Sequence, residues 1–205
     1  MIHRLAAVAV LVSLPIAADA HRLDEYLQAT RLSIGVARVD VEIDLTPGVS
    51  VARDVFDVID ADRDGRINAA ERDAYAREVS HAIALSVDDL QLAMRDVAIQ
   101  IPEREAMSEG VGTIRLRASA TLPRVRSGRH RLAFVNTHRP ESSVYLVNAL
   151  VPTNPRIHIA TQQRDPAQHR LTLDYEVDPS WPRAWSLVAA LLMGAALAVT
   201  RRAKV

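Results

Sequence analysis

The sequence predicts a mainly β fold, an antiparallel sandwich-like domain into which one helix–loop–helix segment is inserted. Apolar and polar residues alternate in 39–45, 114–122 and 171–177, which is the period of strands with one buried face. Short apolar runs separated by Gly, Pro, Asn and Asp have the spacing of an all-β domain. A carboxylate-rich turn at 60–71 interrupts this pattern, and residues at helical spacing flank it.

The beginning of the chain, 1–20, has the features of a secretory signal peptide. His3 and Arg4 form a short basic end, 5–16 is an apolar run, and 18–20 matches an A-x-A cleavage site. The apolar run is short for an uncleaved membrane anchor. We therefore expect the chain to be exported.

The first two strands are expected to form a hairpin. The run 27–34 precedes Gly35, which suits a turn, and the alternating run 39–45 follows it. Alternation returns after the helical insertion, in 114–122 and 171–177. Further strands are expected in short apolar runs rich in β-branched residues, at 132–135, 144–151 and 157–160.

Two helices are expected, one on each side of the turn at 60–71. Before the turn, apolar residues recur at helical spacing at Val51, Val55, Val58 and Ile59. After the turn, they recur at Tyr75, Val79, Ala82 and Ile83.

The turn at 60–71 places oxygen ligands at the spacing that suits a calcium ion. Calcium takes about six to eight hard oxygen ligands. Asp60, Asp62 and Asp64 bring carboxylates at alternate positions onto one side of a tight turn. Gly65 stands where the chain must bend sharply, because a residue without a Cβ makes that bend at the lowest steric cost.

The remaining ligands are expected from the second half of the turn. Arg66 would offer its backbone carbonyl, Asn68 would act through water, and Glu71 would close the site with both carboxylate oxygens. With these residues the segment at about 50–85 resembles the EF-hand, the helix–loop–helix calcium motif. The resemblance implies a bound Ca2+, for which we expect a structural role within a β-rich binding or interaction module.

The chain contains a single such loop, although EF-hands normally work in pairs. A protein partner or a dimer would supply the second hand. Arg63, Arg66 and Arg72 lie in or beside the loop, and positive charge opposes a divalent cation. We therefore expect a dissociation constant in the extracellular range of ~10⁻⁴–10⁻³ M.

The end of the chain carries a predicted transmembrane helix at 181–200, with no charged residue after Arg183 until 201. Trp181 and Trp185 suit the membrane interface, and the basic tail 201–205 suits the cytoplasmic side. The span is either retained or processed as a sorting tail. Either way, 21–180 is expected to be an extracytoplasmic domain, periplasmic or on the cell surface, anchored to the cell membrane by a single pass.

A second functional interpretation concerns the mature N-terminus. Cleavage after Ala20 would leave His21 with a free amine, and an amine beside an imidazole can chelate copper or nickel. The start 20–26 resembles the exported domains of nickel-permease-type hydrogenase and urease accessory membrane proteins. This resemblance implies an alternative function, a periplasmic accessory protein that handles Ni, Co or Cu through His21.

The composition and the absence of known catalytic motifs exclude several other classes of function. The net charge is zero, so no nucleic-acid partner is expected. The chain has no cysteine, which excludes disulfide and thiol chemistry. It contains no H-E-x-x-H, no G-x-S-x-G and no phosphate-binding glycine loop. No enzymatic activity is therefore expected.

The stretch 134–149 mixes asparagines with aromatic and β-branched residues. Asn136 and Asn148 indicate a hydrogen-bonded core or a ligand groove, and the core is favoured because buried amides usually serve structure. The remaining histidines show no ligand spacing and are expected on the surface or in strands, at His81, His130, His138, His158 and His169.

Overall fold

A computed structural model describes residues 24–122 and 126–179. The expected signal peptide 1–20, His21, the expected span 181–200 and the basic tail 201–205 lie outside these residues. None of the helices within the described ranges combines the length and the apolar character needed to cross a membrane.

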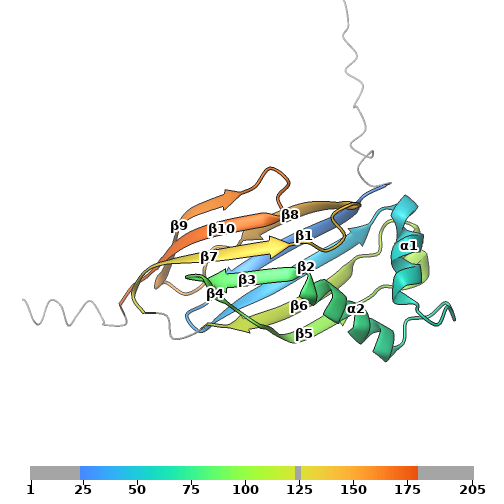
Figure 1. The fold of residues 1–205 in the computed structure, drawn as a ribbon, viewed down its shortest axis with the longest axis horizontal. Coiled ribbons are helices and arrows are strands. Elements are labelled where there is room, and N and C mark those ends of the chain that lie inside the picture. The colour runs from blue at the N-terminus through green and yellow to red at the C-terminus, as the bar shows by residue number, and fades with distance from the viewer. Residues whose placement is uncertain (1–23, 123–125, 180–205) are drawn as a thin grey trace, which may run out of the picture.

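The described residues confirm a mainly β domain with few helices (Figure 1). In chain order its elements are β1 (Tyr26–Ile34), β2 (Arg38–Pro47), α1 (Val49–Ile59), α2 (Ala69–His81), β3 (Ile83–Val87), β4 (Leu90–Gln91), β5 (Met94–Gln100), α3 (Arg104–Ser108), β6 (Ile114–Thr121), β7 (Gly128–Asn136), β8 (Ser143–Ala149), β9 (Ile157–Arg164) and β10 (Arg170–Val177).

The strands form two five-stranded sheets. Sheet A has the order β5-β6-β2-β1-β8, and sheet B has the order β4-β3-β7-β10-β9. The inward side chains of both sheets belong to one hydrophobic cluster. In Figure 1 the sheets lie in two layers, and α1 and α2 lie together at one end of them.

One strand pair departs from the expected antiparallel arrangement, because β1 and β8 are parallel. The remaining pairs between described strands are antiparallel. The reason is the change of sheet after β7. The chain leaves sheet B at Asn136 and enters sheet A beside the start of β1, where Tyr26 is in register with Ser143. It therefore runs in the same direction as β1.

Alternation along the strands explains how the core is filled. In β2 every second residue from Val39 to Pro47 is buried, as the sequence pattern predicts. The hairpin with β1 also forms, with Ile34 in register with Val39 and the N–H of Gly35 bonded to the carbonyl of Arg38 at 2.8 Å. The sheets thus owe their buried faces to the period-2 pattern.

Three strands, β3, β4 and β5, were not expected from the sequence. Ile83 was expected in the helix after the turn, but α2 ends at His81 and Ile83 begins β3. Pairing with β7 decides this, because Ile83 is in register with Asn136 there. β5 is an edge strand interrupted near Asp96, which has a φ of 51°, so its burial shows no alternation.

The two long helices each contribute one face to the shared core. In α1 the buried residues are Ala52, Val55, Phe56 and Ile59. Val58 was expected on this face but is 50% exposed. In α2 the buried residues are Glu71, Tyr75, Ala76 and Val79. The helical segment is therefore packed on the sheets and does not form a separate unit.

Candidate metal centre

The candidate site lies in the loop between α1 and α2. Asp60 directly follows α1, and its N–H bonds the carbonyl of Phe56 at 2.8 Å as the helix ends. Asn68 caps the start of α2, and its side-chain oxygen accepts from the N–H groups of Ala70 and Glu71 at 2.9 and 3.1 Å. The loop is thus fixed at both ends by the helices it connects.

Carboxylates shape the first half of the loop by accepting backbone N–H groups. Asp60 accepts from the N–H groups of Asp64 and Gly65, at 3.1 and 2.9 Å. Asp62 also accepts from Asp64 N at 3.1 Å, and Asp64 accepts from Arg66 N at 2.8 Å. Gly65 has a φ of 84°, a conformation that favours glycine. The sharp bend expected at Gly65 is therefore observed.

Glu71 ties the two halves of the loop together from the first turn of α2. One carboxylate oxygen accepts from Asp62 N at 3.2 Å, and the other accepts from Asn68 N at 3.0 Å. The second bond completes a capping box with Asn68. The side chain is buried among these groups, with an exposed fraction of 7%.

Three of the expected ligands converge. Carboxylate oxygens of Asp60, Asp62 and Glu71 all lie within 4.8 Å of one another. Asp60 is 3% exposed, whereas Asp62 is at the surface. Asp64 is not part of this cluster.

Arg66 and Asn68 belong to the expected ligand set as well. Arg66 would contribute its backbone carbonyl, on which the exposure of its side chain has no bearing, and the amide oxygen of Asn68 caps the start of α2. Ile67, between them, packs against the hydrophobic core. The apolar core therefore supports the loop from behind.

Neighbouring carboxylates affect one another within the cluster. The hydrogen bond from Asp64 N lowers the pKa of Asp62, but desolvation and the negative charges of Asp64, Glu71 and Asp60 together raise it. Backbone N–H groups, rather than arginine side chains, are the observed partners of Asp60 and Glu71 within the described residues. A group of hard carboxylate oxygens of this kind suits a divalent cation such as calcium.

A buried polar network lies one helical turn beyond Glu71. The hydroxyl of Tyr75 lies 2.7 Å from the hydroxyl of Tyr26 in β1 and 3.2 Å from Nε2 of His138 in the β7–β8 connection. His138 is 2% exposed, so the expectation of a surface or strand position was wrong for this residue. The network links the helix that carries Glu71 to both sheets.

Amide side chains complete this network. Asn136 donates to the side-chain oxygen of Gln28 at 2.8 Å and accepts from the N–H of His138 at 2.9 Å. Gln28 donates to the carbonyl of His138 at 2.8 Å. The favoured hydrogen-bonded core is therefore observed for Asn136, whereas Asn148 is exposed. Sequence analysis missed Gln28, although its position in the alternation of β1 places it on the buried face.

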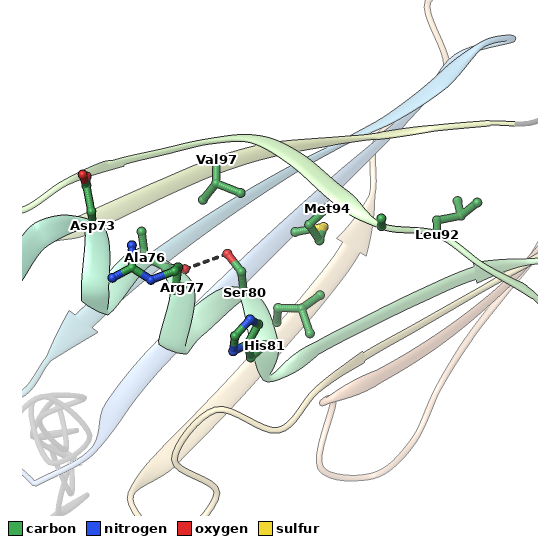
Figure 2. Close-up of a pocket in the computed structure, with 10 residues that line it drawn as sticks. Asp73, Ala76, Arg77, Ser80, His81, Leu92, Met94 and Val97 are labelled. Atoms are coloured by element: carbon green, nitrogen blue, oxygen red, sulfur yellow. Dashed lines mark hydrogen bonds between the residues drawn. The ribbon is translucent and has the colours of Figure 1, made fainter.

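Two grooves flank α2. One, of about 420 Å³, lies beside the acidic cluster and is lined by Asp62, Glu71 and Tyr75 among others. The other, of about 640 Å³, is lined by polar residues of α2 and by apolar residues such as Met94 and Val97 (Figure 2). In this groove Ser80 donates its hydroxyl to the carbonyl of Ala76 at 2.6 Å. That bond holds the serine to its own helix.

No protein-family model matches the chain, and no curated protein matches it.

Proposed function

We propose that this chain is an extracytoplasmic calcium-binding protein in which the ion has a structural role. The observation that carries this proposal is the convergence of oxygens from Asp60, Asp62 and Glu71 in a loop with EF-hand spacing. The apolar segment 181–200 supports a membrane anchor, and 1–20 supports export.

Calcium would be held by the oxygens that the sequence singles out. Asp60, Asp62 and Glu71 supply the carboxylates that already lie together. Asp64 and the carbonyl of Arg66 would complete the set, with Asn68 acting through water. The bound ion supplies positive charge that offsets the repulsion among these carboxylates.

The structural role follows from the position of Glu71. Tyr75 lies one turn further along the same helix face and joins the buried network with Tyr26 and His138. An ion bound to Glu71 therefore stabilises the helix that contacts both sheets. At a calcium concentration ten times the dissociation constant, linkage adds about 1.4 kcal/mol to the free energy of unfolding.

Calorimetric titration of calcium into the purified full-length chain tests this proposal, with thermal unfolding measured in parallel. We expect saturable binding and a higher Tm in calcium. Glu71→Gln should abolish both effects while keeping an oxygen for the cap on Asn68.

Asp73→Asn is the matched control for that experiment. Asp73 lies on the exposed side of α2, and its replacement removes the same charge without touching the cluster. It should bind calcium like the unchanged protein. The proposal fails if calcium neither binds nor raises the Tm, or if both variants respond equally.

The alternative function, handling of Ni, Co or Cu through His21, stays a prediction because His21 lies outside the described residues. Titration with nickel or copper separates it from the calcium proposal. Binding through His21 requires a processed N-terminus and is unaffected by Glu71→Gln.

A dimer or protein partner that supplies a second hand would make the calcium affinity depend on protein concentration.

A further inference from the structure

The strand β8 forms an edge of sheet A that lacks the usual protection against pairing with another chain. Within the described residues the sheets end at β5 and β8 and at β4 and β9. Proteins commonly protect such edges by short strands, irregular pairing, charges or proline. β4 has 2 residues, β5 is interrupted near Asp96, and β9 pairs irregularly and ends at Arg164. β8 pairs with β1 in an unbroken register and contains no charged residue and no proline.

Hydrogen bonds to β1 show which backbone groups of β8 face the open side. The N–H of Tyr26 bonds the carbonyl of Ser142, and the N–H of Leu150 bonds the carbonyl of Leu32, both at 2.8 Å. Even-numbered residues in this part of the chain therefore turn their backbone groups toward β1. The odd-numbered residues of β8 turn theirs away from the sheet.

Side chains of β9 cover the second half of this open edge. Arg164 donates to the carbonyl of Val147 and to the side-chain oxygen of Asn148. The side-chain oxygen of Gln162 accepts from the N–H of Ala149 at 3.2 Å. The first half of β8 lies ahead of this cover.

The first half of β8 combines outward backbone groups with exposed apolar side chains. The backbone groups belong to Ser143 and Tyr145. On the outer face of sheet A, Val144 is 37% exposed and Leu146, two residues further along, is 38% exposed. Leu27 of β1 is in register with Val144 and is 36% exposed. These three side chains are therefore neighbours on one face, beside an open edge.

We propose that two copies of this chain pair through this edge, β8 against β8, antiparallel around a two-fold axis at Val144. Ser143 of each copy then lies opposite Tyr145 of the other, so that their outward N–H and C=O groups bond. Val144 lies opposite Val144 of the second copy, and Leu27 of each copy extends the apolar row. A closed pair of this kind has the symmetry most common among homodimers.

The distribution of charge favours a second copy as the partner. From 142 to 155 the chain has no charged residue, so β8 can lie against itself without repulsion. Glu141, which is exposed, precedes Val144 by three residues, and Val147, which Arg164 contacts, follows it by three. Pairing around Val144 therefore brings Glu141 of each copy toward Arg164 of the other.

Disulfide cross-linking tests the pairing, since the chain has no cysteine of its own. Residues opposite each other without backbone bonds in an antiparallel pair have Cα atoms about 4.5 Å apart, which suits a disulfide. Val144→Cys in the purified full-length chain should give a covalent dimer under mild oxidation. Val97→Cys is the matched control, because Val97 is 38% exposed and lies on β5, at the other edge of sheet A. It should give several-fold less covalent dimer.

Sedimentation of the full-length chain at increasing concentration measures association without a cross-link. We expect a reversible dimer for the unchanged chain and for Val97→Lys, and a monomer for Val144→Lys, in which two lysines would face each other. Glu141→Lys should weaken the dimer several-fold. Circular dichroism checks that each variant folds.

A monomeric unchanged chain overturns the proposal, and this is also the result if β8 pairs with a strand of a different protein. A dimer that Val144→Lys and Glu141→Lys both retain overturns it as well. The proposal does not rest on calcium binding. Val144 lies outside the acidic cluster, so Val144→Lys should bind calcium like the unchanged chain.

Discussion

At the scale of single residues, His138 is a buried histidine with a strongly shifted pKa. Its ring is enclosed by Tyr75, by the edge of Tyr26 and by Glu78, whose carboxylate lies 3.9 Å from Nδ1. Burial, with a smaller effect of the Arg139 charge, lowers the pKa of His138 to about 4. The imidazole is therefore neutral at pH 7 and serves as a hydrogen-bonding group.

Stability should consequently fall as the solution is acidified. The unfolded chain takes up a proton at His138 near pH 6.5, whereas the folded protein resists protonation until about pH 4. The free energy of unfolding should fall by about 3 kcal/mol in total, and the fall should be complete below the pKa of the folded protein. Denaturant unfolding in calcium-free buffer at a series of pH values between 6.5 and 4 measures it.

The control for this pH dependence is His138→Gln, which keeps a polar side chain but cannot titrate. Its stability should be lower at pH 7 and should fall less steeply between pH 6.5 and 4. An equal slope in both proteins would assign the acid sensitivity to other groups.

At the scale of elements, α2 is the connection between the acidic loop and the sheets. Glu71 lies in its first turn and Tyr75 in the next, and both are buried. The Tyr75 hydroxyl contacts Tyr26 and His138, so the helix is fixed by polar contacts as well as by apolar packing. Buried hydroxyls of this kind are costly to remove because their partners are left unsatisfied.

Tyr75→Phe should therefore lower the free energy of unfolding by about 1–2 kcal/mol. Tyr175→Phe is the matched control. The Tyr175 hydroxyl is buried and has no hydrogen-bond partner among the described residues. Its removal should leave stability unchanged or raise it slightly. Denaturant titration of both variants measures the difference, and equal losses would contradict the role given to the Tyr75 hydroxyl.

At the scale of the whole molecule, the helical segment joins the two sheets. α1 follows β2 of sheet A, and α2 precedes β3 of sheet B. Val55 of α1 and Val79 of α2 belong to the same hydrophobic cluster as the inward residues of both sheets. One continuous core favours one cooperative unit.

Calcium should accordingly stabilise the sheets as well as the loop. Thermal unfolding followed by circular dichroism should show a single transition that calcium shifts to higher temperature. Hydrogen exchange resolved by segment should slow in β1 and β7 as well as in α2. Protection confined to 60–81 would show that the helical segment unfolds separately from the sheets.

The sequence alone determined much of the fold, for local reasons. Alternation predicts β2, β6 and β10 because the period of a strand matches the apolar pattern. The acidic turn predicts the break between α1 and α2, since Gly65 and the Asn68 cap act within a few residues. Binding of calcium by this loop stays a prediction that the described geometry supports.

Only the tertiary structure decided the remaining features, because they depend on contacts between distant parts of the chain. Pairing with β7 makes Ile83 part of a strand, and the crossing from sheet B to sheet A makes β8 parallel to β1. Burial of His138 depends on Tyr26 and on Tyr75, which lie 112 and 63 residues before it. Local sequence patterns predict which face of each helix or strand is buried. The residues that contact one another across the core are determined only when the two sheets pack together.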